Sequence, residues 1–325
     1  MNMWQSAARA VRVLAGVAML AMAAAGAPGW ASGAGVPSSI TLDYASYNLL
    51  SLVIREQGLL EEEFRADGVQ INWLYSTGGN KSMEFLLSGS ADFGSGAGVA
   101  CFISFVNGNP IRTLYLINTE AMSIMVPQDS KLQSVGELRG RDVAATPATN
   151  PYVFLIRSLE QAGLGPSDIN IVTLQHPDGK NELVRGRIDA WAGLEPLQSQ
   201  ALQQGARYLY TNPEFTTQVV LSVRRAFLEQ YPQATARVLA VYGRAREWAL
   251  AHPEEFVELV ARSSRISPEI TRLMLKTDHV GIDSDIEQVR PLLRASRGAL
   301  TAIGILSEDS DLEALLDGFI LKERP

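Results

Sequence analysis

The sequence has a single cysteine, Cys101, and three histidines, His176, His252 and His279. One cysteine cannot form an internal disulfide, and the apolar neighbours of Cys101 indicate a buried thiol that packs as a small hydrophobic residue. His252 and His279 are expected at helix ends, where histidine commonly caps the last carbonyl groups. No spacing of His, Cys, Asp and Glu matches a metal site, so we expect neither a metal nor another cofactor.

Motifs of nucleotide-binding enzymes and of hydrolases are also missing. The glycine-rich stretch GSGAG, residues 94–98, fails as a dinucleotide fingerprint because Val99 stands where the third glycine is required. Glu120 does follow at about the right distance to bind a ribose. A serine nucleophile requires G-x-S-x-G, and Ser95 stands at the wrong place in this stretch. We therefore expect no catalytic activity, and keep a secreted hydrolase or isomerase with His176 as its base only as an alternative.

Long apolar runs and clusters of basic residues are scarce as well. The uncharged run 13–25 follows two arginines and is too short for a permanent membrane helix, which is typical of a signal peptide. We predict a signal peptide over residues 1–31, with Ala27 as the second choice of cleavage position, and export to the periplasm. Its removal takes away two of the 28 basic residues and none of the 35 acidic ones, so the net charge moves from −7 to −9. Such an acidic chain is a poor candidate for binding nucleic acid or an anionic membrane.

The remaining 294 of the 325 residues alternate short strands with helices. A chain of this length exceeds what one core usually organises, and the alternation is typical of βα units on mostly parallel sheets. From Arg225 the pattern is helical to the end, with breaks at Pro253 and Pro268. Helices are also predicted at 49–57, 81–87 and 152–161, and strands at 39–45, 69–75, 91–95, 111–117, 123–127, 142–146, 169–174, 188–194, 206–210 and 218–223.

The two halves of the chain resemble each other. Residues 46–55 (SYNLLSLVIR) align with 148–157 (ATNPYVFLIR) at an offset of 102, and 86–96 (LLSGSADFGSG) with 183–193 (LVRGRIDAWAG) at an offset of 97. In each half, a short strand leads through an Asn-containing turn into an amphipathic helix. A second strand, a helix that ends at glycine and a third strand then follow. This order predicts two similar α/β lobes.

We predict an α/β fold with two lobes, two mostly parallel sheets, a hinge and a C-terminal helical tail. Lobe 1 is expected to combine residues 39–122 and 221–325, and lobe 2 to span residues 123–220. Two connections then cross between the lobes, so that the lobes can close on a ligand. Ligands of open α/β sheets bind beyond the carboxyl ends of the strands, where helices begin. The same corners of both lobes are therefore expected to line one cleft.

These corners are rich in groups that bind anions. A helix start offers unpaired amides and a partial positive charge, and glycine lets an anion approach the backbone closely. Each hydroxyl or amide has an ordinary role as a helix N-cap as its alternative. The candidate groups are Ser46, Tyr47, Asn48, Thr77, Gly78, Gly79, Asn80, Ser95, Gly96, Ala97, Gly98, Thr146, Thr149 and Asn150.

Several stretches resemble the periplasmic binding proteins of ABC importers for aliphatic sulfonates, which are related to those for taurine, nitrate and thiamine-precursor pyrimidines. The resemblance covers essentially the mature chain and is weakest in the helical tail. It implies a two-lobed type II binding-protein fold, no catalysis and delivery of a ligand to a membrane permease. It rests on REQGLLEEEF (55–64), STGGNKSMEFLLSGSADFGSGAG (76–98), VPQDSKLQSVGELRGRDVAAT (126–146), NPYVFLIRSLEQAGL (150–164) and LQHPDGKNELVRGRIDAWAGLEP (174–196).

The resemblance also implies the residues of the ligand pocket. Two features depart from the family: a hydroxyl residue often stands where this chain has Gly96, and the segment INTEAM, residues 117–122, lacks an aromatic residue and an arginine-proline pair. The missing arginine and the missing hydroxyl weaken the sulfonate assignment specifically. The implied pocket consists of Tyr47, Asn48, Gly78, Gly79, Asn80, Ser95, Gly96, Ala97, Gly98, Thr146, Thr149, Asn150, Tyr152, Trp191 and Glu195.

Two of these residues have alternative roles. Glu195 would repel a sulfonate unless the far end of the ligand carries an amine or a hydroxyl. Its alternative role is to cap the helix that begins at Pro196. Trp191 is either a wall of the cleft or a core residue.

We expect a monomeric solute-binding subunit of an ABC importer that carries a small organic anion, most simply an aliphatic sulfonate. Taurine, nitrate or a thiamine-precursor pyrimidine are the alternative ligands.

Overall fold

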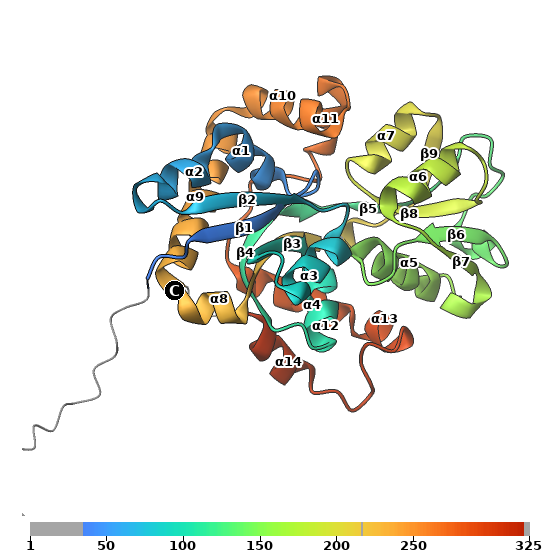
Figure 1. Cartoon of the computed structure of the whole chain (residues 1–325). Coiled ribbons are helices and arrows are strands. Elements are labelled where there is room, and N and C mark those ends of the chain that lie inside the picture. Colours follow the sequence, from blue (N-terminus) through green and yellow to red (C-terminus); the bar gives the residue numbers. More distant parts are fainter. Residues whose placement is uncertain (1–34, 216, 322–325) are drawn as a thin grey trace, which may run out of the picture. The chain divides into compact units, whose positions relative to one another are not determined.

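The computed structural model describes residues 35–215 and 217–321 (Figure 1), and the predicted signal peptide lies outside these residues. The described chain forms two five-stranded sheets. The first sheet has the order β2-β1-β3-β10-β4 and the second the order β7-β6-β8-β5-β9. The strands are β1 (Ser39–Tyr44), β2 (Gln70–Tyr75), β3 (Phe93–Ala97), β4 (Ile111–Glu120), β5 (Met122–Pro127), β6 (Asp142–Ala145), β7 (Asn170–Thr173), β8 (Ala190–Leu194), β9 (Ala206–Thr211) and β10 (Thr217–Arg224).

The two sheets repeat one topology. In the first sheet β10 is antiparallel to its neighbours β3 and β4, and in the second sheet β5 is antiparallel to β8 and β9. The remaining pairs, β1 with β2 and β3, and β6 with β7 and β8, are parallel. The single antiparallel strand of each sheet is the one that follows a crossing from the other sheet. The repeat inferred from the offsets of 102 and 97 therefore corresponds to two sheets with the same strand order.

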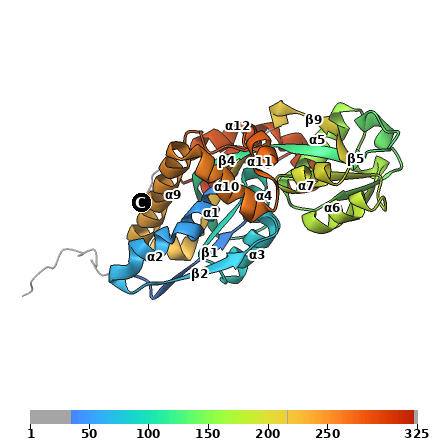
Figure 2. The ribbon, with the colours of Figure 1, turned by 90° about the horizontal axis from the view of Figure 1, so that it is seen from above.

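Helices join successive parallel strands in each half. The first half contains α1 (Leu49–Gln57), α2 (Leu59–Phe64), α3 (Gly79–Ser88) and α4 (Gly98–Val106), and the second contains α5 (Asn150–Gln161), α6 (His176–Val184) and α7 (Leu197–Gln203). Figure 2 shows α5, α6 and α7, in green and yellow, beside the strands of the second sheet. Short 3₁₀ helices lie at Arg65–Asp67, Val135–Leu138, Pro166–Asp168, Pro213–Phe215 and Ile286–Gln288.

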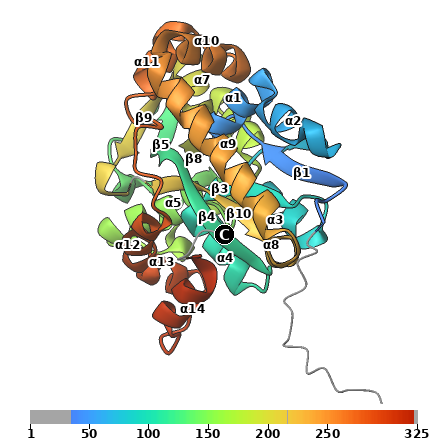
Figure 3. The same ribbon diagram turned by 90° about the vertical axis from the view of Figure 1, so that its left-hand side faces the viewer.

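The C-terminal part of the chain is helical, as the sequence predicts. Its first long helix, α9, packs against α1 and α2 of the first half, and Figure 3 shows α9 running beside α1. Further on, α14 packs against β4 and α4, while α13 contacts α5 of the second half. These helices are α8 (Arg225–Gln230), α9 (Pro232–Ala251), α10 (Pro253–Ser264), α11 (Pro268–Met274), α12 (Val289–Ala295), α13 (Arg297–Ala302) and α14 (Leu312–Phe319).

The largest cluster of buried apolar side chains includes residues of both halves. It contains Phe102 of α4 and Phe319 of α14, whose ring centroids lie 5.5 Å apart, together with Phe154 of α5. Full burial of a side chain of this size contributes about 1.5–3 kcal/mol. Packing of the tail and of α5 against α4 therefore stabilises the arrangement of the helix starts described below.

The predicted and observed elements agree closely, with a few differences. The helix predicted at 49–57 has these bounds in the structure, whereas the strand predicted at 91–95 lies two residues later as Phe93–Ala97. Strand β5 begins at Met122 and β10 at Thr217, so the chain crosses between the sheets near the predicted lobe boundaries. The residue-level division into lobes stays a prediction. No helix within 35–215 and 217–321 combines the length and apolarity needed to cross a membrane.

Candidate functional site

The starts of four helices meet around a small cavity between the two halves, which we call the central cavity. Gly79 and His176 are the first residues of α3 and α6, Ala97 is the N-cap of α4, and Thr149 is the N-cap of α5. Each start directs backbone N–H groups and a partial positive charge outward from its helix. The residues that line the central cavity are Tyr47, Gly79, Ala97, Ala100, Glu120, Thr149, Asn150, Pro151, His176 and Leu194.

A buried carboxylate lies behind the wall in the first half. Asp43 is fully buried, and it accepts hydrogen bonds from Ser76 Oγ at 2.7 Å, from Ser95 N at 2.8 Å and from Ser95 Oγ at 2.9 Å. The Tyr47 hydroxyl lies 3.0 Å from Ser76 Oγ and 3.2 Å from the carbonyl oxygen of Ser95. Burial raises the pKa of Asp43 to about 6, although the hydrogen bonds from Ser76 and Ser95 lower it in part.

The Asp43 contacts change the expected role of Ser95. Its N–H and hydroxyl both donate to Asp43, so a ligand that uses these donors has to replace existing hydrogen bonds. The sequence reasoning did not single out Asp43. The signal that could have found it is a lone acid near the end of an apolar strand, with one serine directly after the neighbouring strand β2 and another within β3.

In the second half, a network of hydroxyl groups holds His176. Thr146 Oγ1 donates to the carbonyl oxygen of Leu174 at 2.7 Å and lies 3.1 Å from His176 Nδ1. Thr149 Oγ1 donates to the carbonyl oxygen of Thr146 at 2.6 Å. Burial lowers the pKa of His176 to about 3, so the imidazole is neutral near pH 7. His176 therefore contributes a polar but uncharged surface to the central cavity.

Three direct contacts near this cavity join the first half, which is built on the sheet that contains β4 and β10, to the second half. Asn150 Nδ2 donates to Glu120 Oε2 at 2.8 Å and also to Thr217 Oγ1. Asn80 Nδ2 donates to Gln175 Oε1 at 3.5 Å. Glu120 is only 2% exposed, and burial raises the pKa of its carboxyl to about 7 against the opposing effect of the Asn150 hydrogen bond.

The predicted glycines lie where other groups approach the backbone closely. A Cβ atom on Gly78 would lie 3.0 Å from His176 Cδ2, and one on Gly98 would lie 2.3 Å from Val289 Cγ2. A Cβ atom on Gly96 would lie 3.1 Å from Gly79 Cα and 3.2 Å from Cys101 Sγ. The departure of Gly96 from the family pattern is thus matched by close packing of β3 on the start of α3.

Two predicted residues have other partners. Trp191 is 1% exposed in a core cluster of the second half, and Cβ atoms on Gly179 and Gly193 would lie 2.6 and 2.4 Å from its ring. Glu195 Oε2 accepts a hydrogen bond from Ser199 N at 3.1 Å in the first turn of α7. The structure therefore favours the core role for Trp191 and the capping role for Glu195.

Asn48 and Tyr152 also lie outside the lining of the central cavity. Asn48 caps α1, because its Oδ1 accepts a hydrogen bond from Ser51 N at 3.0 Å. Tyr152 is partly buried and packs against the largest core cluster. Of the predicted site residues, the structure brings together Tyr47, Gly79, Ala97, Thr149 and Asn150 around one cavity, and adds Glu120 and His176.

Comparison with known proteins places the chain in a family. Residues 63–256, more than half of the chain, match the family model described as NMT1/THI5 like. The chain belongs to the NMT1/THI5-like family. It is 26% identical over 235 residues to a Bacillus subtilis (strain 168) protein named for the binding of aliphatic sulfonates, with 69% of each chain covered. A similarly named Escherichia coli (strain K12) protein is 26% identical over 234 residues, which cover 70% of this chain and 72% of the relative.

A solved structure shares the fold of this NMT1/THI5-like chain. The alkanesulfonate-binding protein SsuA from Xanthomonas axonopodis pv. citri, bound to MOPS, superposes with a TM-score of 0.76 at 19% identity. The match covers 88% of this chain and 98% of that protein. The family resemblance and the two-lobed binding-protein fold inferred from the sequence are therefore confirmed.

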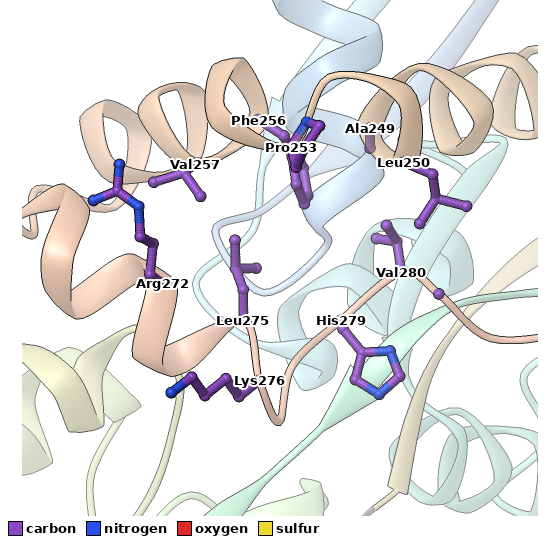
Figure 4. A pocket seen from close by; sticks show the side chains of 11 residues that line it. Ala249, Leu250, Pro253, Phe256, Val257, Arg272, Leu275, Lys276, His279 and Val280 are labelled. Carbon is purple, nitrogen blue, oxygen red and sulfur yellow. The ribbon is translucent and has the colours of Figure 1, made fainter.

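Other hollows of this NMT1/THI5-like chain lie away from the starts of α3, α4, α5 and α6. One contains Glu195 together with Tyr208 and Gln198. Another lies on the tail helices, where Leu250, Pro253, Phe256 and other side chains face it (Figure 4). The tail hollow contains none of the predicted site residues.

The described residues do not form the catalytic arrangement of the hydrolase alternative. His176 bonds to Thr146 and Ser95 Oγ bonds to Asp43, and within 35–215 and 217–321 no hydrogen bond joins His176 to Ser95 or Thr149. The Cys101 thiol is fully buried, and burial raises its pKa to about 12, which keeps it protonated and unreactive. The same part of the chain contains no group of three or more His, Cys, Asp and Glu residues placed to hold a metal ion.

Proposed function

We propose that this NMT1/THI5-like protein is the extracytoplasmic solute-binding subunit of an ABC importer and that it carries a small organic anion, most simply an aliphatic sulfonate. The observation that carries the proposal is the meeting of four helix starts, from α3, α4, α5 and α6, around the central cavity. Backbone amides and helix dipoles bind anions without a cationic side chain, and each helix terminus contributes about 0.3–1 kcal/mol.

A ligand in the central cavity contacts both halves of the molecule and can therefore change how they are arranged. The donors of α3 and α4 come from one half and those of α5 and α6 from the other, so an anion between them bridges the halves. A ligand that contacts both halves stabilises the closed arrangement more than an open one. We propose that the closed arrangement, in which Asn150 binds Glu120 and Thr217, is the form presented to a membrane permease.

The relatives support the sulfonate class. Two curated relatives are named for aliphatic sulfonate binding, and a structural neighbour is an alkanesulfonate-binding protein bound to MOPS. With a periplasmic location and a monomeric state, the protein would act as a carrier and not as an enzyme. The engagement of Ser95 by Asp43 and of His176 by Thr146 supports this non-catalytic role.

Titration calorimetry tests the function directly. Protein freed of any co-purified ligand by unfolding and refolding is titrated with methanesulfonate, ethanesulfonate, taurine, nitrate and sulfate. At a ligand concentration about 100 times the dissociation constant, the bound protein gains about 2.7 kcal/mol of stability, which a melting curve detects. Absence of both heat and a melting shift with all five anions contradicts the proposal.

A pair of variants locates the binding event. Ala100→Leu fills part of the central cavity and is expected to abolish binding, with circular dichroism used to check that the variant folds. Leu250→Ala alters the hollow of Figure 4 and is expected to leave the affinity unchanged. The reverse pattern would move the ligand site to the tail helices.

A further inference from the structure

The wall of the central cavity carries an acid but no basic side chain. Glu120 is the one carboxylate among the described residues that line it, and none of these residues is Lys or Arg. Glu120 ends β4 and is 2% exposed. Its carboxylate accepts a hydrogen bond from Asn150, and no ion pair involves it within 35–215 and 217–321. The acid therefore faces the cavity without a counter-ion from the protein.

The neighbouring titratable groups do not supply positive charge either. Tyr47 and His176 line the same cavity, and burial keeps the phenol protonated and the imidazole neutral, because it raises the pKa of Tyr47 and lowers that of His176. The Cys101 thiol and the carboxyl of Asp278 also lie close enough to interact with Glu120. Asp278 accepts a hydrogen bond from Ala121 N at 2.8 Å, and burial followed by the neighbouring Glu195 and Glu120 raises the pKa of its carboxyl well above the ordinary value, so it adds no positive charge.

A buried carboxylate without a counter-ion is costly, because the single hydrogen bond from Asn150 replaces only part of its lost hydration. The same cavity wall offers helix starts, which favour a negative group. One small molecule satisfies both surfaces if it carries a negative group at one end and a positive group at the other. An alkanesulfonate without an amine leaves Glu120 unpaired and meets its repulsion.

We propose that Glu120 is a specificity-determining residue that pairs with an ammonium group of the ligand, so that the protein selects short aminosulfonates over plain alkanesulfonates. This inference rests on the proposed function and specifies its ligand. In the sequence, the acid implied to face the far end of the ligand was Glu195. In the structure, Glu195 caps α7 and is absent from the lining of the central cavity, whereas Glu120 is part of it.

The test compares matched ligand pairs by calorimetry in phosphate buffer, free of sulfonate and amine buffers. The pairs are ethanesulfonate with taurine, and propanesulfonate with 3-aminopropanesulfonate, with ethylamine as a probe that lacks the sulfonate. The wild type is expected to bind the amine-bearing member of each pair at least tenfold more tightly. The preference is expected to increase from pH 6 to pH 8, because Glu120 becomes more fully ionised over this range.

Two variants separate Glu120 from the other buried acid. Glu120→Gln keeps an oxygen that accepts the Asn150 hydrogen bond and is expected to reduce the preference for the amine to less than twofold. Glu195→Gln is the matched control, since it removes a buried charge outside the cavity and is expected to preserve the preference. If Glu120→Gln does not fold, the role of Glu120 is tested with the wild type alone, by its preference for the amine-bearing ligands and the change of this preference between pH 6 and pH 8.

The outcomes distinguish this inference from the proposed function. Equal binding of both members of each pair at pH 8, or an unchanged preference in Glu120→Gln, overturns the role of Glu120 and leaves sulfonate binding intact. Alkanesulfonates without an amine could instead bind tightly at low pH and more weakly as the pH rises. This result would mean that protonated Glu120 donates a hydrogen bond to the sulfonate, which also overturns the inference. Binding of ethylamine alone, lost in Glu120→Gln, supports Glu120 as the cation partner but overturns the sulfonate function. No binding of any probe overturns both.

Discussion

The two halves of the molecule have the same topology, but equivalent positions carry side chains that differ in polarity and size. Leu42 pairs with Phe93 in the first sheet, and Val143 pairs with Ala190 in the second. Leu42 is therefore equivalent to Val143, and Phe93 to Ala190. The next residues along these strands are equivalent as well, Asp43 to Ala144 and Gly94 to Trp191. The first half therefore has a buried acid and a glycine where the second has a small apolar residue and a tryptophan.

The helices compensate for this exchange. Counted from their first residues, Ser82 of α3 corresponds to Gly179 of α6. A Cβ atom on Gly94 would lie 2.6 Å from Ser82 Oγ, and one on Gly179 would lie 2.6 Å from the Trp191 ring. A bulky side chain on the strand, such as Trp191, therefore requires a glycine on the helix. A side chain on the helix, such as that of Ser82, requires a glycine on the strand. In this repeated fold, side chains that meet across a close-packed layer therefore change together, because the layer has no room for bulk on both elements.

Trp191→Ala tests this comparison with the largest expected effect. The ring is nearly fully buried against two glycines that cannot fill the space left behind. We expect a loss of about 3–5 kcal/mol in the free energy of unfolding, measured by denaturant titration. Ligand affinity should change little in the fraction that is folded, because Trp191 is absent from the cavity lining. A loss below about 1 kcal/mol would show that the second half does not depend on this ring.

Asp43→Asn tests the polar layer of the first half through pH. The folded-state pKa of Asp43 is about 6, above its ordinary value of 3.8, so the folded protein holds this proton more tightly than the unfolded chain. Its contribution to stability is present below about pH 3.8 and is lost as the pH rises through 6. Between pH 4 and pH 7 we expect the wild type to lose about 2.4 kcal/mol relative to Asp43→Asn, as followed by chemical unfolding. A constant difference would contradict a buried, proton-retaining Asp43.

His176→Asn gives the opposite slope in the second half and a smaller effect. The folded-state pKa of His176 is about 3, below its ordinary value of 6.5, so the unfolded chain binds the proton first. Stability from the neutral imidazole is present above about pH 6.5 and is lost as the pH falls toward 3. From pH 7 to pH 5 we expect the wild type to lose about 2 kcal/mol relative to His176→Asn. Parallel pH profiles of the two proteins would refute a His176 that stays neutral.

Much of the fold was predictable because it depends on local patterns. The helix at Leu49–Gln57 follows from an Asn cap, an apolar face and a glycine at its end, all within a few residues. The offsets of 102 and 97 indicated two matching halves, and the two sheets have the same strand order. Residues at helix starts, such as Thr149 and Asn150, were identified for the same reason.

The roles of individual acids and of the tryptophan were not predictable in this way. From the sequence, Glu120 is a candidate only as a ribose ligand, and no local pattern predicts a role for Asp43. Both are defined by partners far away in sequence, since Glu120 meets Asn150 and Asp43 meets Ser76 and Ser95. Trp191 and Glu195 had two roles each, and only packing against Gly179 and the hydrogen bond to Ser199 favour one of them.

The alternation of strands and helices, the repeat and the chemistry available at each helix start follow from the amino-acid sequence, because periodicity and capping act over short separations. The tertiary structure alone decided which of these groups share a cavity and which serve the core. That choice depends on strand order and on the volume of side chains that meet across layers. Glu120 faces the central cavity and Glu195 does not, and this difference arises from the packing of two halves that are separate in the sequence.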